Sequence, residues 1–116
     1  MSVLLGQGKY KYKVVDDWAK LPENWSFMDV AGVAVNSKDE VYVFNRGEHP
    51  MIVFDLDGNY LRSWGENLFS RPHGIHIGPD DYLYCTDDGD HTVKKISPDG
   101  KLIFQIGVPG NPSEFM

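Results

Sequence analysis

Side chains able to bind a metal ion or an anion gather in three short segments of the sequence. The segments are VFNRGEHP (43–50), ENLFSRPH (66–73) and CTDDGDHT (85–92). Imidazole nitrogens are frequent zinc ligands, and a guanidinium group matches a carboxylate with two parallel hydrogen bonds. These residue types predict a site for a metal ion, a carboxylate or both. The candidates are Arg46, Glu48, His49, Arg71, His73, Asp87, Asp88, Asp90 and His91.

Two of these segments occupy the same place in an internal repeat. Residues 32–65 align with residues 74–107 without a gap at an offset of 42, and eight of the 34 pairs are identical. The glycine and the histidine of the first loop recur in the second, whereas Arg46 is replaced by Asp88. The repeat therefore predicts one loop frame that is built twice with opposite charge.

Each repeat contains four short segments that are rich in Val, Ile, Tyr and Phe and separated by turn sequences. Strands are predicted at 32–36, 40–45, 51–55 and 59–64, and again at 74–78, 82–87, 92–97 and 101–106. A four-stranded unit that recurs every ~40 residues is typical of a β-propeller blade. We therefore predict an all-β fold with two four-stranded blades and one extra N-terminal strand. A β-sandwich is the alternative, and it explains the turns but not the gapless repeat.

The repeat divides the chain into three parts. Residues 1–31 form an N-terminal strand (9–15) and an irregular loop, residues 32–73 the first blade with its linker, and residues 74–116 the second blade with a shortened linker. The last residues resemble a linker that stops where another inner strand should start, so we expect a truncated propeller. Because both blades already have four strands, the N-terminal strand is expected to pair with a neighbouring chain's blade edge or to stay unpaired.

The candidate residues are predicted to share one end of the blades. In an antiparallel meander, alternate connections lie at opposite ends. The loops after the second strand of each blade and the linker between the blades therefore lie together, where a propeller has the mouth of its channel. Three alternatives stay open: Gly47 and Gly89 serve loop geometry, His49 and His91 pack against a neighbouring blade, and the DDGD acids are solvated charges.

Composition excludes several classes of function. Eleven basic and seventeen acidic residues give a net charge of −6, with no basic patch, so we expect no nucleic-acid partner. No apolar run approaches the ~18 residues of a membrane span, and the N-terminus lacks the apolar stretch of a secretory signal. A single cysteine, Cys85, excludes an intramolecular disulfide. A cytoplasmic protein with no membrane contact is the resulting expectation.

The repeats resemble NHL repeats, and the string VFNRGEHP…LFSRPHGIHI…YLYCTDDGDHTVKKISPDGK resembles the first two blades of the peptidyl-α-hydroxyglycine α-amidating lyase family. The resemblance covers roughly residues 10–116. It implies a six-bladed propeller with an axial zinc ion, which cleaves a C-terminal α-hydroxyglycine into a peptide amide and glyoxylate. By this resemblance Arg46 matches the substrate-site arginine and His91 a metal-ligating histidine. His73 stands where a later blade carries another ligand, and His49 has only its loop position in its favour.

The chain departs from this family in length and in its tyrosines. Two of six blades are present, and Tyr42 and Tyr84 do not match the family's catalytic tyrosine. Little or no lyase activity is therefore expected of this chain alone. The alternative is a non-catalytic NHL platform that binds a peptide or a protein.

Self-assembly is the expected consequence of two blades with open apolar flanks. Three copies would supply six blades, so we expect a homo-oligomer, most simply a C3 trimer. Such a trimer would bring three copies of His91 to one axis, where they would either rebuild a zinc site, with His73 as the competing ligand, or surround an empty, hydrated channel. Asp87 and Asp90 would orient the imidazoles, and Glu48 and His49 complete the loop face.

Overall fold

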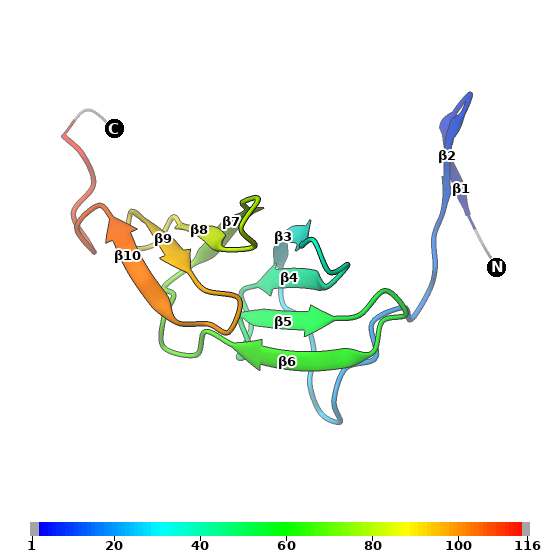
Figure 1. Ribbon diagram of the computed structural model, residues 1–116, viewed down its shortest axis with the longest axis horizontal. Coiled ribbons are helices and arrows are strands. Elements are labelled where there is room, and N and C mark those ends of the chain that lie inside the picture. The colour runs from blue at the N-terminus through cyan, green and yellow to red at the C-terminus, as the bar shows by residue number, and fades with distance from the viewer. Residues whose placement is uncertain (1–2, 115–116) are drawn as a thin grey trace.

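The computed structural model describes residues 3–114, and in this range it contains strands, turns and loops but no helix (Figure 1). Within the same range there is accordingly no helix long and apolar enough to cross a membrane. Three antiparallel sheets organise the chain. The strands are β1 (Leu4–Gln7), β2 (Tyr10–Lys13), β3 (Val30–Val35), β4 (Val41–Asn45), β5 (Met51–Phe54), β6 (Tyr60–Trp64), β7 (Pro72–Ile77), β8 (Leu83–Asp87), β9 (Thr92–Ile96) and β10 (Leu102–Ile106).

The two predicted four-stranded units are confirmed. Strands β3 to β6 form one sheet in sequence order, and β7 to β10 form a second sheet with the same meander. Each blade closes its last hairpin with an Asp-Gly turn, in which Gly58 and Gly100 adopt the positive φ angles of 82° and 90°. The strand bounds differ from the predicted ones by at most two residues, which is the usual uncertainty at strand ends.

The two blades pack face to face around one apolar core. The first blade contributes Tyr42, Phe44, Met51, Val53 and Trp64, and the second contributes Leu83, Cys85 and Ile96. The inner strands β3 and β7 lie side by side, and Phe69 of the linker meets Phe44 edge to face at a centroid distance of 4.7 Å (Figure 1). The Cβ that an alanine would add at Gly100 lies 2.5 Å from the Trp64 ring, so this turn needs glycine to pack on the indole.

The opposite face of the first blade is covered by residues 18–27, which we call the cap segment. Its aromatic residues Trp18 and Phe27 pack on Phe54, with ring centroids 5.6 and 6.1 Å away. Backbone contacts fix its start, because Lys20 donates its N–H to the carbonyl of Gly58 at 2.8 Å. The expectation that both flanks of the blade pair are open is therefore wrong for this side, since the chain covers the flank itself.

The outer face of the second blade is the counterpart of the face that the first blade buries. At an offset of 42, the buried residues of the first blade correspond to Tyr84, Thr86, Val93, Lys95 and Ile106. These side chains are half-buried or exposed, and Ile106 is 62% exposed. The Lys95 ammonium lies over the rings of Tyr82, Tyr84 and Phe104 at 5.2 to 5.8 Å. Residues 3–114 of a single chain therefore leave this flank open.

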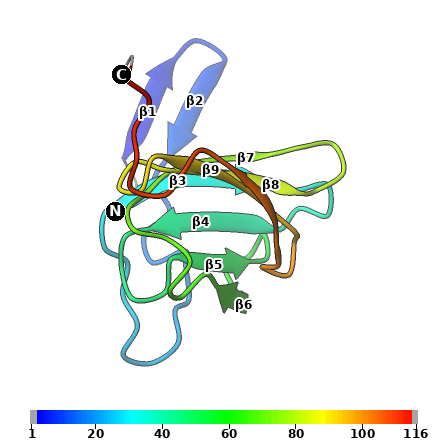
Figure 2. The same cartoon turned by 90° about the vertical axis from the view of Figure 1, so that its left-hand side faces the viewer.

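The N-terminal part forms a hairpin that stands away from the blades (Figures 1 and 2). Strand β2 confirms the predicted strand at 9–15 in shorter form, and it pairs with β1 of the same chain, so it does not stay unpaired. Pairing with a neighbouring chain's blade edge stays a prediction. Strand β1 was not predicted, because its LLGQ sequence has neither alternation nor β-branched residues. All eight residues of the two strands are exposed.

Candidate functional site

An arginine–histidine cluster lies at the end of the blades where the sequence places the candidate residues. It consists of Arg46, Arg71, His73 and Asp88. Arg46 directly follows β4, Asp88 directly follows β8, and His73 belongs to the inner strand β7. The charge-reversed positions of the repeat, Arg46 and Asp88, are thereby brought together, with Nη2 3.9 Å from Oδ2. The opposite charges therefore contribute to one site.

One carboxylate oxygen of Asp88 faces three basic groups. Its Oδ2 lies 3.3 Å from Nδ1 of His73, 3.5 Å from Nη1 of Arg71 and 3.9 Å from Arg46. Arg46 and His73 also meet directly, at 3.4 Å between Nη2 and Nδ1. The cluster therefore carries more basic groups than acids, on a chain whose net charge is −6.

The guanidinium of Arg46 is fixed by the backbone. Its Nε donates to the carbonyl of Pro72 at 2.8 Å, and the Arg46 backbone N–H donates to the carbonyl of Met28 at 2.7 Å. The side chain is 24% exposed, so the group is mostly shielded yet reaches solvent. A guanidinium held in this way keeps its orientation without help from another charge.

A side chain at the end of the second strand holds the loop of each blade. In the first blade, Oδ1 of Asn45 accepts the N–H groups of Gly47 and Met28, and its Nδ2 donates to the carbonyl of His49. Asp87 takes this position in the second blade, where the counterpart of Met28 is Ser70. The shared loop conformation therefore depends on Asn45 and Asp87, whereas the other side chains of the two loops differ.

Asp87 is buried and accepts four backbone N–H groups from the linker and the loop. Burial raises the pKa of this carboxyl, but the hydrogen bonds lower it by more, so the pKa lies below its ordinary value. The carboxylate therefore stabilises the fold above the unfolded-state pKa of about 3.9, and this contribution is lost as the pH falls through the folded-state pKa.

We predict that Asp87→Asn lowers the free energy of unfolding by about 1–3 kcal/mol at neutral pH, because the amide NH₂ faces backbone donors. The difference from the wild-type chain should shrink in acid, where Asp87 is protonated. Urea unfolding at neutral pH and below the ordinary aspartate pKa measures both effects. The exposed Asp57→Asn is the control for the charge. A deficit that stays constant with pH would contradict the predicted role.

Asp90 and Lys94 form a second polar contact in this loop. Lys94 is 3% exposed, and its Nζ donates to Asp90 at 2.8 Å and to Thr92 at 2.7 Å. The hydrogen bonds of Asp87 and Asp90 thus serve the fold within one chain, and the orientation of imidazoles by these acids in a trimer stays a prediction. Burial raises the pKa of the neighbouring Cys85 to about 12, with only a partial offset from Lys94, so this thiol stays protonated at neutral pH.

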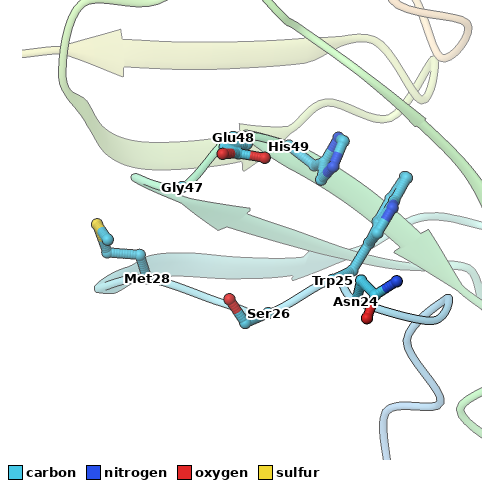
Figure 3. Close-up of a pocket in the computed structure, with 7 residues that line it drawn as sticks. All are labelled: Asn24, Trp25, Ser26, Met28, Gly47, Glu48 and His49. Atoms are coloured by element: carbon cyan, nitrogen blue, oxygen red, sulfur yellow. The ribbon is translucent and has the colours of Figure 1, made fainter.

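His49 and Glu48 line a small pocket beside the cap segment (Figure 3). The imidazole of His49 stacks on the Trp25 indole at 3.5 Å and 10°, and its Nδ1 lies 3.2 Å from a Glu66 oxygen. The pocket measures about 180 Å³, and Met28 lies on its rim. His49 therefore packs on the cap segment and beside the linker, apart from the arginine–histidine cluster, and its packing against a neighbouring blade stays a prediction.

His91 lies on the outer side of the second blade. Its φ angle is 64°, and it lines a groove of about 490 Å³ together with Val93, Ile106 and Val108. Within residues 3–114, no group of three or more His, Cys, Asp or Glu side chains could hold a metal ion. His73 and His91, the two histidines predicted as ligands, are therefore not part of such a group within these residues, and zinc binding stays a prediction.

The sequence places Asp88 and Arg71 at the loop end of the blades but assigns neither of them a role. The signal that distinguishes Asp88 is the charge reversal of the repeat. Trp25 and Lys94 were not recognised as partners of the loops. Lys94 stands where the first blade has Ile52, and this departure from the repeat indicates an ionic contact.

Comparisons with known proteins support the blade architecture. No family model matches the chain. NHL repeat-containing protein 3 from Homo sapiens is 35% identical over 123 aligned positions, which cover 92% of this chain and 35% of that protein. Peptidyl-alpha-hydroxyglycine alpha-amidating lyase 1 from Drosophila melanogaster is 36% identical over 64 positions, with 50% of this chain and 12% of that protein covered. Peptidylglycine alpha-amidating monooxygenase from Rattus norvegicus is 29% identical over 97 positions, with 62% and 10% covered.

Two packed four-stranded meanders with charged loops at one end define a propeller-like protein. With these relatives, the chain belongs to the NHL-repeat family. It spans about a third of the human relative and about a tenth of the amidating enzymes.

Proposed function

We propose that the chain is a two-blade unit of an amidating-lyase-like NHL propeller, and that its loop face binds the carboxyl terminus of a peptide. The observation that carries this proposal is the Arg46 guanidinium, which the backbone carbonyl of Pro72 orients beside Arg71 and His73. The name of the Drosophila relative states that it acts on a peptidyl-α-hydroxyglycine, a substrate that ends in a carboxylate.

The chemistry of the cluster suits a terminal carboxylate. The planar guanidinium of Arg46 pairs with both carboxylate oxygens, and the more exposed Arg71 adds positive charge at the rim. The His73 ring, 60% exposed, offers a ring nitrogen as a hydrogen-bond partner beside the bound ligand. These groups bind and orient, and the release of glyoxylate would need further residues. We therefore expect little or no lyase activity from this chain alone.

Zinc binding is a further part of the proposal. One chain offers single imidazoles, so a site would combine His91 or His73 with histidines of other blades. When bound, the zinc ion would polarise the hydroxyl or the carboxylate of the substrate. Zinc quantification on purified protein tests this, with His91→Ala and His73→Ala as the variants. No bound zinc in the wild-type chain would contradict this part of the proposal.

Assembly into a six-bladed C3 trimer would provide those other blades. The open outer face of the second blade, with Ile106 exposed, supports self-association. The cap segment covers the first blade, so the contact would join this face to Trp18 and its neighbours, or displace them. Light scattering that gives the mass of one chain at micromolar concentration would contradict self-assembly.

The carboxylate site is tested with N-acetylglycine as the ligand and its neutral amide as the control. We predict saturable binding of the acid, no binding of the amide, and a loss of at least tenfold in affinity in Arg46→Gln, since a charged hydrogen-bond partner contributes roughly 1.5–3 kcal/mol. Lys38→Gln removes a positive charge from the opposite end of the blades and should change little. Equal affinities of Arg46→Gln and the wild-type chain would contradict the proposal.

A non-catalytic interaction platform is the second candidate function. The pocket between the cap segment and the Glu48–His49 loop favours it, because Trp25 and Met28 offer apolar contacts to a side chain (Figure 3). A peptide that binds equally well as acid and as amide would identify this function, whereas dependence on the terminal carboxylate identifies the first.

A further inference from the structure

We propose that Asp88 is a built-in competitor for the carboxylate site, so that a ligand carboxylate binds by displacing it from Arg46, Arg71 and His73. This inference rests on the proposed carboxylate-binding function. It means that the charge reversal of the repeat directly affects the affinity and specificity of ligand binding.

Asp88 occupies the place that a ligand carboxylate would take. Its Oδ2 lies 3.3 Å from His73, 3.5 Å from Arg71 and 3.9 Å from Arg46. A carboxylate of this chain therefore faces the same three groups that an external carboxylate requires. Since these three groups cannot be fully engaged by two carboxylates at once, the internal and external anions compete.

The contacts of Asp88 are loose enough to be exchanged. Two of its three distances are 3.5 Å or more, beyond the 2.7–2.9 Å of a strong charged hydrogen bond. Its other oxygen, Oδ1, is buried and has no hydrogen-bond partner among the described residues. Because the side chain is 34% exposed, rotation toward solvent would hydrate both oxygens. Displacement of Asp88 by a ligand therefore replaces weak contacts of its carboxylate with hydrogen bonds to water.

Arg46 does not depend on Asp88 for its orientation. The carbonyl of Pro72 accepts from Nε at 2.8 Å, and the backbone N–H of Arg46 is bound at 2.7 Å. Removal of the Asp88 charge should therefore leave the guanidinium in place and make it more available. A positioning role for Asp88 would have the opposite consequence, because its loss would then weaken ligand binding. The sign of the effect distinguishes the two roles.

The test is a titration of the full chain with N-acetylglycine, comparing the wild type with Asp88→Asn. If Asp88 occupies the site about 80–90% of the time, only ~0.1–0.2 of the molecules are competent, and its removal tightens binding about 5–10-fold. Asp57→Asn, an exposed acid at the opposite end of the blades, controls for net charge and should change the affinity by less than about twofold. Thermal unfolding shows whether Asp88→Asn is folded, and Asp88→Ser serves as a second variant.

The outcomes separate this inference from the function on which it rests. Tighter binding in both Asp88 variants, with no gain in Asp57→Asn, supports the competitor role. Binding by the wild type that is lost in Arg46→Gln, but is equal or weaker in the Asp88 variants, overturns the competitor and leaves the site. No binding of N-acetylglycine by the wild type or by the Asp88 variants overturns both.

Discussion

Phe44→Ala is expected to lower the free energy of unfolding by about 3–5 kcal/mol, because it removes a fully buried ring from the contact between the blades. The ring meets Phe69 edge to face at 4.7 Å, and the cavity left behind lies where strands β4 and β7 approach each other. Small domains are stable by about 5–15 kcal/mol, so the loss is a large share of the total. Urea unfolding followed by tryptophan fluorescence measures it.

The matched control is Phe104→Ala, the same change on the open outer face of the second blade. Phe104 is 45% exposed, and the Lys95 ammonium lies over its ring at 5.8 Å, so its loss should cost about 1 kcal/mol or less. Equal costs for the two variants would mean that the blades are not joined by the core described above. Much greater cost at Phe104 would mean that the outer face is covered in solution.

Gly58→Ala is expected to destabilise the chain by about 2–5 kcal/mol and to loosen the cap segment. The residue has a φ angle of 82°, which costs an L-residue about 1–2 kcal/mol. The added Cβ would lie 1.8 Å from the backbone oxygen of Trp18, so the cap segment must move, at a further cost of about 1–3 kcal/mol. Tryptophan fluorescence should shift to the red as Trp18 becomes hydrated.

Gly8→Ala supplies the comparison, because Gly8 also has a positive φ of 62° but an added Cβ meets no atom within 4 Å. It should show the backbone cost alone, about 1–2 kcal/mol, confined to the hairpin and without a fluorescence change at Trp18. If Gly58→Ala behaved like Gly8→Ala, the cap segment would not be packed on the turn as described.

The blades could be predicted because the sequence repeats them. The gapless offset of 42 fixes eight strands, and Asp-Gly turns mark the last hairpin of each blade. The cap segment could not be predicted, because residues 18–27 have no period and depend on contacts with Phe54 and Gly58, far along the chain. Strand β1 was missed because its short sequence gains order only by pairing with β2.

The site was predictable in part. Arg46 and His73 were placed on one face by strand order alone, and they meet at 3.4 Å. His91 shares that end of its blade, but a positive φ and a position on the outer side separate it from the cluster. The role of Asp87 in holding backbone N–H groups follows from burial, which a lone acid in a loop sequence does not reveal. Only the three-dimensional contact shows that Asp88 faces Arg46.

The most direct test of the proposed site is a nuclear magnetic resonance titration of the labelled chain with N-acetylglycine. We predict saturable shifts of the Arg46 Nε–H signal and of backbone amides in 46–49, 70–73 and 88–91, with none in Arg46→Gln and none for the neutral amide. Shifts confined to the groove beside β10, or no saturable shift in the wild-type chain or in Asp88→Asn, would contradict the central claim that the arginine–histidine cluster is the binding site.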